Sequence, residues 1–263
     1  MGRFDEQIAA APLGDGRYRV RFDPQWRVVR GPNGGYLAAV LAQAIRAEVG
    51  DDARQLRSLT VHYPRVAAEA EADVAVTVER AGRGLTTLSV RCEQEGRVVA
   101  LALAAAATPY PPSVEYADAP MPPVPPPEEV PDPEIPDAFR ELPILRHYEI
   151  RPVLGHPPLS RASQAYAGGW IRLREERPID APLLVAISDS WWPSPYAVTD
   201  GLIAAPTVDL TVHLRAALPR PHDWVLIEVR SRTAQEGFLE EDTRIFARDG
   251  TLLAQSRQLA LAL

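Results

Sequence analysis

The two halves of this chain carry the same sequence pattern, and this internal repeat limits the folds that the chain can adopt. The motif Leu59-Thr-Val-His62 recurs as Leu210-Thr-Val-His213, and the glycines of the turns that follow match as well. Across these matches the offset between the halves stays at 151 to 154 residues. A nearly constant offset over several elements indicates that one structural unit has been duplicated.

Each half contains the same predicted elements in the same order. Alternating polar and apolar residues predict strands, and apolar residues at intervals of three and four predict a helix. In the first half these patterns predict a strand over 17–22, a helix that includes 37–46, and strands over 55–65, 72–80, 85–95 and 97–108. In the second half they predict strands over 145–153 and 165–174, a helix that begins at 180, and strands over 206–217, 224–233, 238–247 and 251–263.

The second helix carries one carboxylate among apolar residues. Asp180 is suited to cap its N-terminus, and Pro193 is expected to end it. Asp189 is therefore predicted more than two turns inside the helix, beside Ile187 and Trp191. Burial disfavours the ionised carboxylate and raises its pKa, which brings a general base close to neutral pH. The alternative is a carboxylate on the solvent side of the helix, bound by a serine or an arginine.

A proline-rich segment separates the two halves. Residues 109–136 contain many prolines, several acids and few large apolar side chains. This composition is typical of an extended, semi-rigid linker, and a docking site for a proline-binding partner is the alternative. We therefore divide the chain into an N-terminal unit over 1–108, a linker over 109–143 and a C-terminal unit over 144–263.

The composition disfavours several classes of function. The chain has 28 Lys and Arg against 35 Asp and Glu, and its net charge of −7 provides no basic field for nucleic acid or anionic lipid. No uncharged run is long enough to span a membrane, so we expect a soluble cytoplasmic protein. Cys92 is the only cysteine and is expected in the core, and the five histidines are scattered, so no metal site is predicted.

A long apolar helix followed by a long antiparallel sheet suggests that the sheet curls around the helix. Because this arrangement is predicted twice, the sequence resembles the double-hotdog acyl-CoA thioesterases. It is similar to the bacterial acyl-CoA thioesterase II family and its peroxisomal relatives over nearly the whole chain outside the linker. The resemblance implies an α+β double hotdog, in which each central helix is wrapped by a curled antiparallel sheet. It also implies a homodimer of such chains.

Three positions in the second half make the resemblance specific. In the family, an Asp in the second central helix, a Thr or Ser that opens the next strand and a Gln in the last strand position the hydrolytic water. Asp189, Thr207 and Gln258 match these positions in the same order. The resemblance therefore implies that Asp189 is the general base, and that Thr207 and Gln258 orient the water.

The start of the first helix matches many hotdog proteins. Its residues Asn33, Gly34, Gly35 and Tyr36 are expected to bind the substrate. Backbone N–H groups at a helix N-terminus favour negative charge, and glycine permits a close approach. The N–H groups of Gly35 and Tyr36 are therefore candidate donors to the thioester oxygen as it becomes negative.

Together these residues imply an enzyme that hydrolyses acyl-CoA thioesters without a cofactor. The alternative is a non-catalytic protein that binds acyl thioesters as a sensor or carrier, because hotdog folds host both. The segment Leu210-Thr-Val-His213 differs from the aromatic and histidine-rich strand usual in the family, so the preferred acyl chain length cannot be carried over. The repeat places Leu56 opposite Thr207 and Ala104 opposite Gln258, which predicts one working site per chain.

Overall fold

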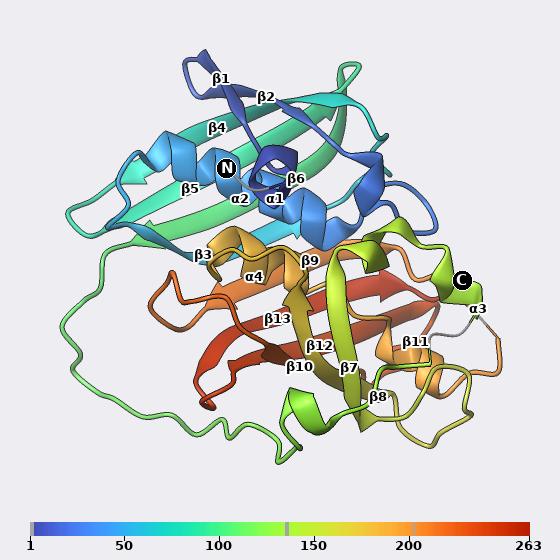
Figure 1. Ribbon diagram of the computed structural model, residues 1–263. Coiled ribbons are helices and arrows are strands. Elements are labelled where there is room, and N and C mark those ends of the chain that lie inside the picture. The colour runs from blue at the N-terminus through green and yellow to red at the C-terminus, as the bar shows by residue number, and fades with distance from the viewer. Residues whose placement is uncertain (1–2, 135–136, 202) are drawn as a thin grey trace.

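A computed structural model of the chain describes residues 3–134, 137–201 and 203–263. Within these ranges, 13 strands form one continuous, largely antiparallel sheet that curls around two central helices, α2 and α4 (Figure 1). The α+β double hotdog expected from the sequence is confirmed. No helix in the described ranges is both long and apolar enough to cross a membrane.

In the first half, the sheet wraps helix α2. Its elements are α1 (Arg3–Gln7), β1 (Ala11–Gly14), β2 (Arg17–Arg21), α2 (Gly34–Val49), β3 (Gln55–His62), β4 (Glu71–Ala81), β5 (Leu85–Gln94) and β6 (Arg97–Ala107). Helix α2 begins at the Asn33 cap and ends at Gly50, whose left-handed conformation suits glycine. Its residues from Gly35 to Ile45 are almost all buried, so this apolar helix is surrounded as predicted.

The second half repeats this arrangement around a shorter helix. Its elements are α3 (Asp137–Arg140), β7 (Tyr148–Gly155), β8 (Tyr166–Leu173), α4 (Ala181–Ile187), β9 (Thr207–Leu214), β10 (Val225–Arg230), β11 (Ala234–Gln235), β12 (Phe238–Ala247) and β13 (Leu252–Leu261). Short 3₁₀ turns lie at Pro24–Trp26, Pro127–Glu129, Pro143–Arg146 and Ser194–Ala197. Most predicted strand boundaries agree with these to within three residues.

Two predictions about the elements are wrong. The chain does not start with the strand at Arg17, because α1 and β1 precede it. Helix α4 ends at Ile187, so Asp189 lies just beyond the helix and not inside it. The hydroxyls of Ser188 and Ser190 donate to the carbonyls of Val185 and Ile187 at 2.8 and 2.9 Å. These side chains thus provide donors for backbone carbonyls at the end of the helix.

The halves are related by an approximate two-fold axis between strands β3 and β9. These strands pair antiparallel in the middle of the sheet (Figure 1). In their register Thr60 lies directly opposite Thr211. The two threonine hydroxyls are 3.0 Å apart, and their residues are separated by the repeat offset of 151. A residue that meets its own repeat partner lies on the axis, so each half faces the other as two identical subunits would.

The second part of the linker is attached to the outer face of the C-terminal sheet. Met121, Val124 and Val130 pack on a buried cluster of Trp170, Trp224, Leu226 and Phe246. Trp170 Nε1 donates to the carbonyl of Pro125 at 2.8 Å, and both guanidinium NH groups of Arg248 contact the carboxylate of Glu128 at 2.6 and 2.7 Å. This part of the linker therefore covers apolar surface that would otherwise face water.

The linker predicts where a protease cuts the folded chain. Residues 109–118 are exposed, and Tyr116 exposes 87% of its surface, whereas residues 121–130 pack on the sheet. We therefore expect brief chymotrypsin treatment to cleave first after Tyr116, because exposed loops are nicked before packed segments. Mass spectrometry of the fragments and gel filtration without denaturant check this, and the halves should elute together. First cleavage inside 121–130 would contradict it.

Candidate active site

Asp189 lies where the C-terminal end of α4 meets the N-terminal end of α2. Its Oδ2 atom accepts hydrogen bonds from the Gly35 N–H at 2.9 Å and from Asn33 Nδ2 at 3.1 Å. Asn33 Nδ2 also donates to the Asp189 backbone carbonyl at 2.8 Å, while Asn33 Oδ1 accepts from the Tyr36 N–H and caps α2. The two halves thus form one site together, because Asp189 is bound by residues more than 150 positions away in the sequence.

The environment of Asp189 raises its pKa. The residue keeps some accessible surface, but protein atoms surround its carboxylate, and this burial raises the pKa from 3.8 to about 6. The Gly35 N–H, the nearby Gln258 amide and the Asn33 amide favour the ionised form and limit the rise. Asp189 is therefore largely ionised at neutral pH and can still accept a proton, as a general base requires.

Thr207 and Gln258 lie together on adjacent strands, as the family resemblance implies. Thr207 Oγ1 donates to Gln258 Oε1 at 3.1 Å. Gln258 Nε2 in turn donates to Oε2 of Glu241, its cross-strand partner on β12, at 2.9 Å. The Gln258 amide also lies close enough to the Asp189 carboxyl to lower its pKa, so the structure brings all three predicted catalytic side chains together.

Glu241 was not identified from the sequence, although it is among the most buried acids of the chain. Only 2% of its surface is exposed. Its Oε1 accepts from the Ser194 N–H at 2.6 Å and from Ser194 Oγ at 2.8 Å. Burial, together with repulsion from Asp189, raises the Glu241 pKa from 4.5 to about 7, while the bonds from Ser194 and Gln258 oppose this rise. Two coupled acids therefore share this site.

The start of α2 differs from the expectation in one respect. The N–H groups of Gly35 and Tyr36, expected to face the thioester oxygen, already donate to Asp189 and Asn33 within the protein. The Tyr36 side chain is fully buried and stacks on Trp26 with ring centroids 4.9 Å apart, so it belongs to the core. The Gly34 N–H, in contrast, has no acceptor among the residues that the structure describes.

Gly34 and Gly35 allow the two helices to meet closely. A Cβ atom on Gly34 would lie 3.0 Å from Asp189 Oδ2 and 3.5 Å from Cζ of Tyr63. The Tyr63 hydroxyl donates to the Gly34 carbonyl at 2.8 Å, and burial raises the pKa of this phenol well above 10. Tyr63, a second residue missed from the sequence, thus stays protonated beside Asp189.

The matching positions of the first half carry apolar side chains. In both halves the sheet register is the same, with Leu59 opposite Ala104 and Leu210 opposite Gln258. Leu88 is the partner of Ala104 just as Glu241 is the partner of Gln258. Three polar residues of the second half therefore correspond to apolar residues of the first: Thr207 to Leu56, Gln258 to Ala104 and Glu241 to Leu88.

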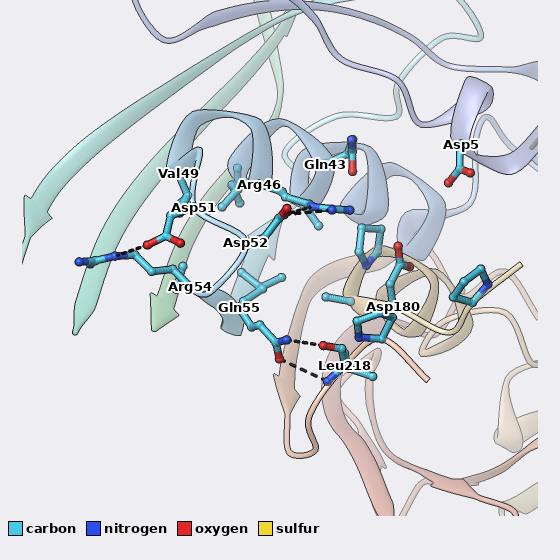
Figure 2. A pocket seen from close by; sticks show the side chains of 18 of the residues that line it. Asp5, Gln43, Arg46, Val49, Asp51, Asp52, Arg54, Gln55, Asp180 and Leu218 are labelled. Carbon is cyan, nitrogen blue, oxygen red and sulfur yellow. Dashed lines mark hydrogen bonds and ion pairs between the residues drawn. The ribbon is translucent and has the colours of Figure 1, made fainter. Parts of the chain in front are cut away.

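A cavity of about 620 Å³ lies at the opposite end of the helix pair, where α2 ends and α4 begins (Figure 2). Leu56 and Ala42 line it. Ala42 is the counterpart of Asp189, because each lies nine residues after the residue that caps its helix. Arg46 pairs with Asp52 at 3.1 Å, and Gln55 binds the backbone of Leu218 (Figure 2). This cavity is the counterpart of the Asp189 site without its carboxylate.

Cys92 is buried in the core, as predicted, and burial raises its thiol pKa to about 12. Across 3–134, 137–201 and 203–263, no three His, Cys, Asp or Glu side chains are grouped as metal ligands would be.

Comparison with known proteins gives matches in both halves. The N-terminal domain of acyl-CoA thioesterases matches residues 22–108, and the C-terminal domain of acyl-CoA thioesterases matches residues 117–262. None of the curated protein sequences matches the chain.

Solved structures match over almost the whole chain. A conserved protein of unknown function with a hot dog fold from Alicyclobacillus acidocaldarius is 25% identical, with a TM-score of 0.89 over 100% of this chain and 98% of that chain. A candidate thioesterase II from Thermobifida fusca YX is 28% identical, with a TM-score of 0.84 over the same shares. An acyl-CoA thioesterase II from Mycobacterium marinum is 22% identical, with a TM-score of 0.76 over 99% and 98%, and supports the fold alone.

Proposed function

Because the chain belongs to the acyl-CoA thioesterase family, we propose that it hydrolyses acyl-CoA thioesters to the free acid and coenzyme A. The observation that carries this proposal is the Asp189 carboxylate, which the start of α2 binds and which lies near the Gln258 amide that accepts from Thr207. A thioesterase needs a water that loses its proton as it attacks the carbonyl carbon. Asp189 is the base for this water in the proposed reaction, and Thr207 and Gln258 fix its position.

The start of α2 supplies the second requirement of the proposed reaction. As water attacks, the thioester oxygen becomes negative and is stabilised by donors already in place. The free Gly34 N–H, at the positive end of a 16-residue helix, is the donor that the geometry favours over those of Gly35 and Tyr36. Asn33 and Gly35 then act on substrate indirectly, because they hold the Asp189 carboxylate.

A thiol-release assay across acyl-CoA chain lengths tests this function directly. Release of coenzyme A by the purified chain, abolished in the Asp189→Asn variant, is the expected result. The alternative, an acyl-thioester sensor or carrier, predicts binding of the same ligands without release. Tight binding without release of coenzyme A at any chain length would therefore show that the protein binds acyl thioesters and does not hydrolyse them.

The activity should depend on pH through Asp189. This acid must be ionised to accept a proton, and its pKa is raised to about 6. We therefore expect kcat/KM to fall as the pH drops through about 6, whereas an ordinary aspartate would keep it constant down to about pH 4. Initial rates between pH 4.5 and 8.5, with checks that the fold survives at each pH, measure this. A rate independent of pH down to 4.5 would exclude Asp189 as the base.

The two halves should provide one productive site per chain. The counterpart cavity is lined by Leu56 in the place of Thr207 and by Ala42 in the place of Asp189, and the strand position that matches Gln258 carries Ala104. Titration with a non-hydrolysable acyl-CoA analogue should give one site that is sensitive to Asp189→Asn. The double variant Leu56→Thr, Ala104→Gln should add no second site, since it adds no base. Two equivalent sites, both lost in Asp189→Asn, would contradict this.

A further inference from the structure

We infer that Glu241 is a positioning residue, which holds the Gln258 amide in the orientation that turns an N–H toward Asp189. This inference rests on the proposed function, because it gives Gln258 a role in positioning water. Neither Glu241 nor its partner Ser194 belongs to the three residues that the sequence predicted as catalytic. The inference is carried by hydrogen bonding, by burial and by comparison of the two halves.

Hydrogen bonding fixes which end of the Gln258 amide faces which neighbour. Thr207 Oγ1 donates to Oε1, so this end of the amide is held as an acceptor. The Glu241 carboxylate accepts one Nε2 hydrogen at 2.9 Å. The second hydrogen of the same nitrogen remains available to the Asp189 carboxyl, whose pKa the Gln258 amide lowers. If Glu241 could not accept, the amide could rotate by half a turn and present its oxygen to the Asp189 carboxylate.

Glu241 is itself held in place from the opposite side. Its Oε1 accepts both the N–H and the hydroxyl of Ser194, which is completely buried. Ser194 lies in the same segment as Asp189, five residues farther along. Glu241 therefore connects the segment that carries the base to the strand that carries the amide, and fixes one relative to the other.

Comparison of the halves shows that the fold does not need an acid at this position. Leu88, the counterpart of Glu241, is fully buried in the same register on β5. A buried carboxylate is costly unless it is well hydrogen-bonded, whereas a leucine here is stable. The acid occurs only in the half that also carries Thr207 and Gln258, which indicates that it serves their chemistry.

Two titratable groups face Glu241 within the described residues. Asp189 follows α4, and Tyr196 lies in the 3₁₀ turn that begins at Ser194. Repulsion between the carboxylates makes their ionisation coupled, so both belong to the pH profile of one site. Tyr196 stays protonated through this range, because burial and then the Glu241 charge raise its pKa above 10.

The test compares Glu241→Gln with Glu240→Gln. The substituted amide keeps the size of Glu241 but places a donor opposite Gln258 Nε2, so we expect kcat to fall roughly tenfold to a hundredfold with little change in KM. Glu240 is the adjacent acid, 8% exposed, and accepts from the Arg232 N–H at 2.6 Å away from this network. Glu240→Gln should keep the rate of the natural protein, and thermal unfolding should show both variants folded.

Two further measurements separate positioning from a loss of structure. If Glu241 acts through Gln258, the double variant Glu241→Gln, Gln258→Ala should be no slower than Gln258→Ala alone. If both acids must ionise, kcat/KM of the natural protein should already fall as the pH drops through about 7, before the fall through about 6 that Asp189 causes. At lower pH the slope of log kcat/KM against pH should approach about 2, and Glu241→Gln should reduce this slope to about 1.

The outcomes distinguish this inference from the proposed function. The inference is wrong if Glu241→Gln has the same effect as Glu240→Gln, or if its effect multiplies with that of Gln258→Ala in the double variant. The proposed function would still stand in either case, provided that Asp189→Asn is inactive. Full activity of both Asp189→Asn and Gln258→Ala would instead overturn the proposed function.

Discussion

The Asp189→Asn variant is expected to lose turnover by a factor on the order of a hundred or more while it keeps its fold. Asparagine has the same shape, and its Oδ1 can still accept from the Gly35 N–H and Asn33 Nδ2, so the contact between α2 and α4 is retained. The amide cannot take a proton from water. Thiol release under saturating substrate measures the loss, and circular dichroism measures the fold.

The effect of this substitution on stability has a defined sign. The folded-state pKa of Asp189, about 6, lies above its ordinary 3.8, so the carboxyl stabilises the fold below pH 3.8, and this contribution is lost as pH rises through 6. At pH 8 the Asn variant should therefore unfold at a higher temperature than the natural protein. Asp180→Asn, at the other end of the same helix, is the matched control and should keep its activity. Near-normal turnover of a folded Asp189→Asn variant would exclude Asp189 as the general base.

Replacement of Gly35 by valine is expected to reduce kcat/KM by a similar factor, although Gly35 lies in the opposite half. A Cβ atom there would lie 2.8 Å from the Ala186 carbonyl and 2.8 Å from Cβ of Asp189. Both neighbours belong to the α4 segment, so the helices must separate and the Gly35 N–H moves away from the carboxylate. Steady-state kinetics and thermal unfolding together measure this effect.

Two companion variants make this prediction specific. Gly201→Ala introduces a Cβ that meets no heavy atom of the described residues within 4 Å, its chain neighbours apart, and should leave both activity and stability unchanged. Gly35→Ala should fall between the natural protein and Gly35→Val, because the smaller side chain requires a smaller shift. If Gly35→Val keeps normal kcat/KM, close contact between the halves is not needed for the reaction.

The repeat and the apolar periodicity were sufficient to predict most of the fold. Strand β12 begins and ends where predicted, since the turns at Gly237 and Asp249-Gly250 bound it on both sides. The end of α4 could not be located, because prolines at 193 and 195 mark the latest possible end, and the serine hydroxyls end the helix earlier. Element β1 was missed because its four residues, Ala-Pro-Leu-Gly, are all exposed and show no alternation of polar and apolar side chains.

The candidate site could be predicted only in part. Asp189, Thr207 and Gln258 came from a resemblance, and their proximity depends on strand register that no single segment reveals. Glu241 had a signal in the sequence, because the repeat offset aligns this acid with Leu88, and a buried apolar position that becomes charged in one copy is unusual. The hydrogen bond from the Gly35 N–H to Asp189 could not be predicted from the sequence. The motif at the start of α2 fits an N–H that faces the substrate as well as one that faces the protein.

The contact between Thr60 and Thr211 also has an evolutionary consequence. In a pair of identical subunits, each mutation changes both symmetric sites, so the start of every helix must suit the role of donor and the end of every helix must suit the role of base. Two halves in one gene are free of this restriction. Helix α2 can keep Gly34 and Gly35 while α4 begins with Ala181 and Pro182, and each copy can accumulate substitutions that would be harmful in the other.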